Sequence, residues 1–240
     1  MIVLGAVGKN GAGKDKLLEY ISEKYGIKMF SIGDMCRDIA AKRGVEPIRE
    51  NLNEISREML REHGPRYFID EIARLIKEGG HQGALVPSIR YPSDVKLCKE
   101  VFGNNFKLVK VEISDDNVRL ERMKKRGSAR DPKNMDELRA TDAGEEATFQ
   151  ISVTEKMADF TIKNDGTKED FHTAIDKFVE KNFPNIMQKT SPESPAKVLI
   201  SFRNGNKTYA EEVLGNTAKK KGTNKKRKGY PAKGGHRKRR

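Results

Sequence analysis

The segment from Gly8 to Lys14 constrains this chain more than any other part of the sequence. Its spacing fits the pattern G-x-x-x-x-G-K-[ST], except that Asp15 stands where Ser or Thr is expected. The apolar run Ile2–Leu4 precedes it and has the composition of a buried strand, while residues 15–24 have apolar side chains at helical spacing. Strand, glycine loop and helix therefore follow one another in the order that a phosphate-binding loop requires.

Glycines let the backbone N–H groups of such a loop turn inward around an anion. The helix N-terminus adds the positive end of its dipole, and Lys14 adds a full charge. A glycine turn that binds nothing is the alternative, and the agreement of strand, spacing and helix argues against it. We therefore predict that the phosphates of a nucleotide are bound by Gly8, Lys9, Asn10, Gly11, Ala12, Gly13, Lys14, Asp15 and Lys16.

Asp15 is the one departure from the phosphate-loop pattern. The Ser or Thr hydroxyl at this position normally contacts Mg²⁺, and a carboxylate is also a hard oxygen ligand. We predict that Asp15 contacts Mg²⁺. The alternative is that it only favours the start of the helix electrostatically.

Short segments with strand character alternate with segments of helical spacing along the chain. Strands are expected at 2–4, 26–31, 83–87, 106–113 and 159–163, with helices between them. This alternation predicts a three-layer α/β fold, in which a parallel five-stranded sheet has helices on both faces. Ligands of such a sheet bind at the carboxyl ends of its strands. The polar run 126–146 is predicted to be a mobile helical segment.

Composition divides the chain into a body and a C-terminal extension. We predict a body at 1–183, a proline-marked linker at 184–197, a small hairpin within 198–218 and a disordered basic tail at 219–240. The hairpin rests on Asn204-Gly205, which is the favoured two-residue turn.

The positive charge of the chain is concentrated in this extension. Residues 186–240 hold 16 of the 48 Lys and Arg residues but only 3 of the 35 Asp and Glu residues, which leaves 32 of each sign in the rest. The whole formal net charge of +13 therefore lies at the C-terminal end. This asymmetry predicts RNA or DNA as a partner of the tail, and a solubilising tail with no specific partner is the alternative.

Hydropathy and cysteine content indicate where in the cell the protein is expected. The mean hydropathy is −0.76, and no apolar run is long enough for a membrane span or signal peptide. Cys36 and Cys98 have no paired spacing, so neither a disulfide framework nor a metal site is expected. These features predict a cytoplasmic protein with no membrane partner.

The segment that follows the second expected strand, Ser31-Ile-Gly33-Asp34-Met-Cys-Arg37, resembles the S-x-G-D-x-x-R segment of adenylate kinases. In that family the arginine holds the phosphate of the acceptor nucleotide. The resemblance implies that Ser31, Asp34 and Arg37 bind the acceptor, and an arginine can clamp a phosphate with two hydrogen bonds. A solvated charge on a helix is the alternative for Arg37.

The segment beyond the third expected strand, Ser88-Ile-Arg90-Tyr-Pro-Ser-Asp94, is similar to the D-x-R-x-P-x-E stretch of two kinase families. These are the deoxynucleoside monophosphate kinases and an archaeal family of dephospho-coenzyme A kinase-like proteins. Arg90 is retained, whereas Ser88 replaces the usual Asp and Asp94 takes the Glu position. The resemblance implies that Arg90 holds the acceptor, and a surface charge is the alternative. Because Ser88 replaces this acid, the role that the resemblance gives it in Mg²⁺ or acceptor positioning does not carry over to this chain.

Four arginines, Arg119, Arg122, Arg126 and Arg130, follow the fourth expected strand. The first three share one helix face, and these kinases have a lid with arginines in this place that closes over the transferred phosphoryl group. The resemblance implies that Arg122, Arg126 and Arg130 stabilise that group and that Arg139 and Asp142 belong to the same lid. A solvated helix is the alternative.

The resemblance covers about residues 1–183 and implies a P-loop NTPase fold of the nucleoside monophosphate kinase type. It implies an enzyme that passes the γ-phosphoryl group of MgATP to a nucleoside or deoxynucleoside monophosphate or to dephospho-coenzyme A. In this enzyme Lys14 neutralises the β- and γ-phosphate oxygens. The segment 164–166 also resembles the N-D-G ending of the archaeal family and is either an adenine contact or a plain turn. The alternative function is an ATP-binding regulatory or RNA-associated module.

Overall fold

The computed structural model describes residues 1–87, 89–128 and 131–184, so the predicted hairpin, the tail and nearly all of the linker lie outside the described residues. The strands of the described part are β1 (Ile2–Val7), β2 (Lys28–Met29), β3 (Gly83–Val86), β4 (Phe106–Glu112) and β5 (Phe160–Lys163). The helices are α1 (Lys14–Tyr25), α2 (Ile32–Arg43), α3 (Arg49–His63), α4 (Tyr67–Glu78), α5 (Pro92–Phe102), α6 (Asp116–Arg126), α7 (Met135–Phe149), α8 (Ile151–Lys156) and α9 (Lys168–Asn182), with a 3₁₀ turn at Gly103–Asn105.

The strands form one sheet in the order β2-β3-β1-β4-β5, and every pairing is parallel. β1 lies at the centre, where Val3 is opposite Ala84 of β3 on one side and Phe106 of β4 on the other. Residues 3–7 are all buried, because a parallel sheet is covered on both faces and its central strand must be apolar throughout. The predicted fold, a parallel five-stranded sheet of the P-loop kinase-like type, is confirmed.

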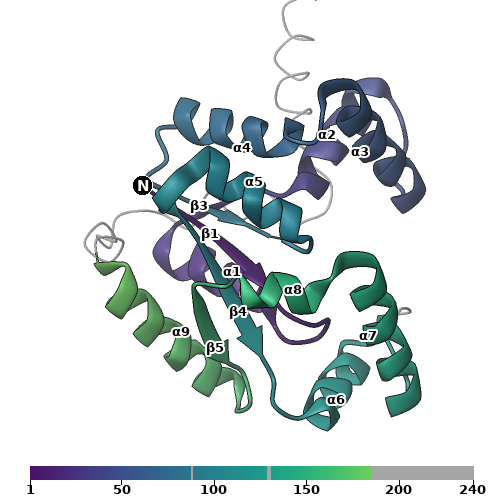
Figure 1. The fold of residues 1–240 in the computed structure, drawn as a ribbon, viewed down its shortest axis with the longest axis vertical. Coiled ribbons are helices and arrows are strands. Elements are labelled where there is room, and N and C mark those ends of the chain that lie inside the picture. The colour runs from purple at the N-terminus through teal and green to yellow at the C-terminus, as the bar shows by residue number, and fades with distance from the viewer. Residues whose placement is uncertain (88, 129–130, 185–240) are drawn as a thin grey trace, which may run out of the picture. The chain divides into compact units, whose positions relative to one another are not determined.

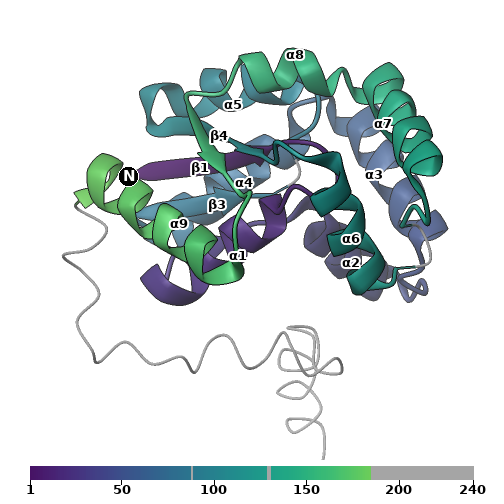
Figure 2. The ribbon, with the colours of Figure 1, turned by 90° about the horizontal axis from the view of Figure 1, so that it is seen from below.

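Helices pack on both faces of the sheet (Figure 2). α1 and α9 lie on one face, where Leu17 and Ile175 are fully buried together with Val109 of β4. α4 and α5 lie on the other face, where Ile72 and Val95 are fully buried. Each face has its own hydrophobic core, and the three layers hold the carboxyl end of β1 in a fixed place.

Two helical pairs lie on the same side of the molecule, α2 with α3 and α6 with α7 (Figure 1). α2 and α3 pack through Cys36 and Ile55, and α6 packs on α7 through Met123 and Leu138. These pairs flank the region beyond the carboxyl ends of the strands, where ligands of parallel sheets bind.

One predicted strand is shorter in the structure, and one predicted helical segment is found. The second strand was expected at 26–31, but only Lys28–Met29 pairs with β3, because β2 is an edge strand that the chain leaves at once to begin α2. The polar run 126–146 was expected to be a mobile helical segment. Its helical character is confirmed, because it contains most of α7, and its mobility stays a prediction. The Asn134 side chain caps this helix by accepting from the Glu137 N–H at 2.9 Å, and Leu138 is fully buried. Every helix of the described residues is too short or too polar to cross a bilayer.

Candidate active site

The loop between β1 and α1 is the centre of the candidate site. Residues 8–13 join the buried end of β1 to the first turn of α1, and Gly8, Gly11 and Gly13 have positive φ angles. A Cβ atom at Gly13 would lie 2.5 Å from Nδ2 of Asn164. Glycine is needed here both for the backbone conformation and for this close approach. The loop leaves the N-terminus of α1 directed at the space where an anion would bind.

Lys14 begins α1, and its Nζ donates a hydrogen bond across the loop to the Lys9 carbonyl oxygen at 3.2 Å. Burial lowers the pKa of Lys14, two nearby carboxylates raise it, and the guanidinium groups of Arg90 and Arg126 lower it further. Cations from three separate segments therefore act on one another at this loop. Like charges so placed repel, and an anion such as a chain of phosphates relieves that repulsion.

Arg90 lies in the loop between β3 and α5. Its guanidinium carbon is 5.0 Å from the centroid of the Phe149 ring, its backbone N–H donates to the Asp94 carboxylate at 3.1 Å, and its carbonyl accepts from Thr154 Oγ1 at 2.8 Å. The backbone is thus held from two sides while the side chain is exposed. Asp94 also accepts from backbone N–H groups at the start of α5, so it caps that helix. Ser88 lies outside the described residues.

Arg126 ends α6. Its Nε donates to Asp131 Oδ2 at 2.8 Å, and this ion pair holds the pKa of Arg126 above its ordinary value, with a smaller contribution from Asp15. The charge of Arg126 also acts electrostatically on Lys14 and lowers its pKa. Arg130 lies outside the described residues, so its role in the lid stays a prediction.

Arg122 ties the β5–α9 loop to α6. Its guanidinium donates to the carbonyl oxygens of Asn164 and Gly166, both at 2.6 Å. Asn164 in turn donates from Nδ2 to the Ala12 carbonyl at 2.8 Å, and Asp165 accepts from the Ser114 N–H at 2.7 Å. The 164–166 segment is therefore fixed to the P-loop and to α6. Sequence reasoning identified the segment but missed the contact of Asn164 with the P-loop, because the two lie 152 residues apart.

Arg119 corrects the predicted lid. Only 1% of its side chain is exposed, and it forms ion pairs with Asp142 of α7 and Asp116 of α6. It does not share an open face with Arg122 and Arg126, because α7 packs over it. Asp142, which was expected in the lid, is the counter-ion of this buried arginine, and its place in the lid stays a prediction.

The expected acceptor residues lie at the start of α2. Ser31 is the N-cap of this helix, and Asp34 and Arg37 form an ion pair on its exposed surface. Within the residues that the structure describes, no hydrogen bond or ion pair links Arg37 to the P-loop. Its role in acceptor binding stays a prediction.

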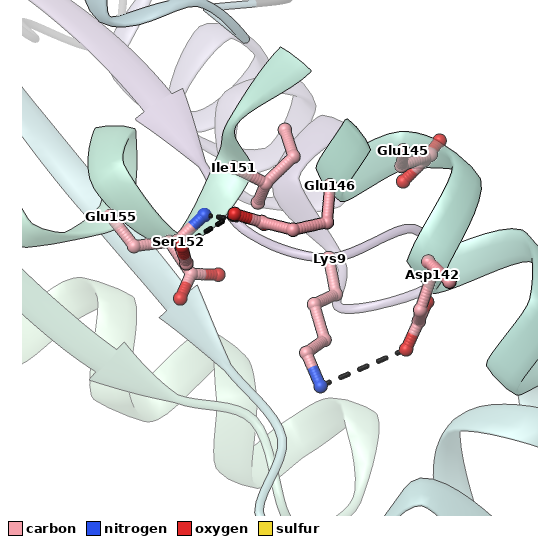
Figure 3. Close-up of a pocket in the computed structure, with 8 residues that line it drawn as sticks. Lys9, Asp142, Glu145, Glu146, Ile151, Ser152 and Glu155 are labelled. Carbon is pink, nitrogen blue, oxygen red and sulfur yellow. Dashed lines mark hydrogen bonds and ion pairs between the residues drawn. The ribbon is translucent and has the colours of Figure 1, made fainter. Parts of the chain in front are cut away.

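A pocket of about 360 Å³ adjoins the P-loop at Lys9 (Figure 3). Its wall comes mainly from α7 and α8 and consists of Lys9, Asp142, Ala143, Glu145, Glu146, Ile151, Ser152 and Glu155. Glu146 accepts from the Ser152 N–H at 2.9 Å, and Glu155 pairs with Lys110 at 3.5 Å. This wall has four carboxylates and one lysine, so it favours a ligand with hydrogen-bond donors. The cations around Lys14 favour phosphates instead.

The charge at Asp15 fits the predicted Mg²⁺ site. Its side chain is exposed, it acts electrostatically on both Lys14 and Arg126, and no hydrogen bond or ion pair occupies it among the described residues. The same residues contain no group of three or more His, Cys, Asp and Glu side chains that would hold a metal alone. Mg²⁺ in phosphoryl-transfer sites is bound through one or two carboxylates together with substrate phosphates, so a single free carboxylate beside the P-loop fits it.

Similar solved structures share the fold only loosely. The shikimate kinase from Acinetobacter baumannii in complex with shikimate is 14% identical, with 77% of this chain and 94% of that chain covered and a TM-score of 0.44. An uncharacterised protein from Eubacterium ventriosum is 12% identical, with 75% and 98% covered and a TM-score of 0.49. At such low sequence identities and TM-scores, these similarities say nothing about the reaction.

Sequence relatives are closer. A family model described as an AAA domain matches residues 7–139. A UPF0200 protein of Pyrococcus horikoshii is 31% identical over 189 residues, which cover 77% of this chain and 99% of the relative. A UPF0200/UPF0201 protein of Archaeoglobus fulgidus is 34% identical over 213 residues, which cover 85% of this chain but only 64% of the relative. The chain therefore belongs to the UPF0200 family and contains an AAA-type P-loop domain.

Proposed function

We propose that this protein is an ATP-dependent phosphotransferase that passes the γ-phosphoryl group of MgATP to a nucleotide-like small molecule. The observation that supports it most is that the charges of Arg90 and Arg126 act on Lys14, which begins α1 after the loop at the carboxyl end of β1. Phosphoryl transfer depends on positioning and on charge stabilisation, and these three cations supply the charge.

Each part of the site has a role in this proposal. The P-loop N–H groups and Lys14 bind the phosphates of ATP, and Arg126 meets the charge that develops on the transferred group. Arg90, with Arg37 from α2, binds the anionic part of the acceptor. Asp15, together with the phosphates, would hold Mg²⁺, which would supply further neutralisation.

The adenine would lie against the 164–166 segment. Arg122 and Asn164 fix that segment to the P-loop, so the base and the phosphates are held in one frame. In this arrangement Arg122 acts on the base side of the nucleotide. Its predicted contact with the transferred phosphoryl group competes with the two carbonyls that it already binds.

A panel of acceptors tests the proposal. The full chain is incubated with MgATP and nucleoside monophosphates, deoxynucleoside monophosphates or dephospho-coenzyme A, and ADP is measured against a control without acceptor. We expect one acceptor class to raise ADP release well above the control. Lys14→Ala should reduce turnover by about 10²-fold or more, since it removes charge from a partly dry site. Lys77→Ala, on the exposed surface of α4, is the matched control.

The alternative function, an ATP-binding regulatory or RNA-associated module, predicts a different result from the same panel. ATP would bind to the wild-type protein and not to Lys14→Ala, while no acceptor raised ADP release. Unchanged ATP affinity in Lys14→Ala would contradict both functions.

A further inference from the structure

The side chain of Arg119 is enclosed between the P-loop and α7. Its guanidinium donates to Asp142 Oδ1 at 2.9 Å, forms an ion pair with Asp116 at 3.0 Å and donates to the backbone carbonyl of Asn10 at 3.3 Å. Asn10 is at the tip of the P-loop, between Lys9 and Gly11. A guanidinium with 1% exposure and these acceptors is directed at the protein and not at a ligand.

The stem of Arg119 also contacts the loop. At Gly11, where φ is +82°, a Cβ atom would lie 2.7 Å from Met123 Sδ and 3.1 Å from Arg119 Cγ. The P-loop tip therefore packs directly on α6 with no room for a side chain. Glycine at this position gives the loop its close contact with the helix that carries Arg119.

Asp142 connects two neighbouring P-loop residues to α7. It binds Arg119, which holds the Asn10 carbonyl, and its Oδ2 is also 3.7 Å from Lys9 Nζ (Figure 3). In an anion-binding loop the N–H groups must point inward, so the carbonyls need partners on the outside. Arg119 supplies such a partner to Asn10 from a buried position.

We propose that Arg119 is a positioning residue for nucleotide binding, which sets the P-loop tip from its outer side, and that Asp142 is the counter-ion that keeps it there. The proposal rests on the proposed function for its ligand, ATP. In this proposal Arg119 does not bind phosphate, unlike Arg90 and Arg126. α7 affects ATP affinity through Asp142, without contacting ATP.

A purely structural role is the competing explanation, because Arg119 also joins α6 to α7. Leu120, Met123 and Leu138 form an apolar contact between the same two helices. If Arg119 only joined these helices, its loss would lower thermal stability and leave the ATP dissociation constant of the folded protein unchanged. Affinity therefore has to be measured together with stability.

The test compares Asp142→Asn and Arg119→Lys with two controls in the full chain. Asp136→Asn makes the same change on the exposed side of α7, and Arg74→Lys makes the same change in an exposed ion pair on α4. Titration calorimetry gives the ATP dissociation constant, and circular dichroism gives the melting temperature. We expect both test variants to weaken ATP by about tenfold, as a small displacement of binding groups does, and both controls to leave it unchanged.

Conservative rescue sharpens this comparison. Asp142→Glu keeps the carboxylate and should recover most of the ATP affinity that Asp142→Asn loses. If the acceptor panel identifies an acceptor that the protein phosphorylates, steady-state kinetics add a second readout. Relative to wild type, the test variants should show a larger rise in the KM for ATP than in the KM for that acceptor. Arg119→Lys keeps a buried charge opposite Asp142 and so provides a folded variant if larger changes prevent folding.

Equal ATP affinity in wild type, Asp142→Asn and Arg119→Lys, with lower melting temperatures, would overturn the proposal and leave Arg119 as a link between helices. The measurement depends only on ATP binding and does not require phosphoryl transfer to occur. If no acceptor is turned over but the test variants still lose ATP affinity, the phosphotransferase proposal fails while the positioning role of Arg119 stands.

Discussion

At the scale of single residues, one departure from the usual P-loop motif is the most informative. Asp15 replaces the hydroxyl residue of the P-loop, and its carboxylate is exposed beside Lys14 and Arg126. A carboxylate binds Mg²⁺ more strongly than a hydroxyl but adds negative charge near the phosphates. The dependence of turnover on Mg²⁺ concentration should therefore show what Asp15 does.

We expect Asp15→Ala to raise the Mg²⁺ concentration for half-maximal turnover by about tenfold, because one oxygen ligand is lost. Asp15→Ser, which restores the usual residue type, should need less Mg²⁺ than Asp15→Ala. A Mg²⁺ titration at fixed ATP distinguishes the variants. If all three proteins share one curve, Asp15 only favours the start of α1.

A second prediction at this scale concerns Arg37, which pairs with Asp34 on the surface of α2. Arg37→Ala should raise the acceptor KM or lower kcat by about tenfold and leave the ATP dissociation constant nearly unchanged, because Arg37 binds only the acceptor in our proposal. Arg57→Ala, in a similar exposed pair on α3, is the control. Equal damage to both ligands would place Arg37 outside the acceptor site.

At the scale of elements, sequence reasoning succeeded where the signal is local. The β1–loop–α1 unit was predictable because strand, glycines and helix adjoin in sequence. The direction of Arg119 was not, because its partner Asp142 lies 23 residues later on another helix. Helical spacing alone placed Arg119 on the same face as Arg122. The packing of α7 on α6 shows that Arg119 is buried, whereas Arg122 contacts the 164–166 segment.

The clamp on the 164–166 segment gives a prediction at the same scale. Arg122→Ala removes both of its bonds to carbonyl oxygens, so the segment should lose its fixed position. We expect the KM for ATP to rise by about tenfold and the preference for ATP over GTP to fall, with a smaller change in kcat. Steady-state kinetics with both nucleotides provide the measurement. A fall in kcat alone would instead support direct contact with the transferred phosphoryl group.

At the scale of the whole molecule, the charge asymmetry predicts that nucleic-acid binding and phosphoryl transfer belong to different parts of the chain. The basic tail, 219–240, has 12 Lys and Arg residues and no Asp or Glu. We propose that it binds RNA or DNA through phosphates, since it offers little besides Tyr230 and His236 to contact a base. The body has balanced charge and would not bind nucleic acid in this way.

Truncation after Asn216 should abolish RNA or DNA binding and leave turnover of the small-molecule acceptor unchanged. For the full chain, the affinity for single strands should fall with salt with a log–log slope of about −0.7 for each neutralised phosphate. Binding and turnover are measured on the same two proteins across a salt series. A truncated protein with full nucleic-acid affinity, or a complex insensitive to salt, would contradict this division.

The central place of β1 in the sheet also affects the order in which the protein folds during its synthesis. β1 is made before its neighbours β3 and β4, which begin only at Gly83 and Phe106. The ends of the P-loop cannot be fixed until both neighbours have left the ribosome, because these contacts are distant in sequence. We therefore expect that ATP cannot stabilise the nascent chain before about Glu112 has emerged.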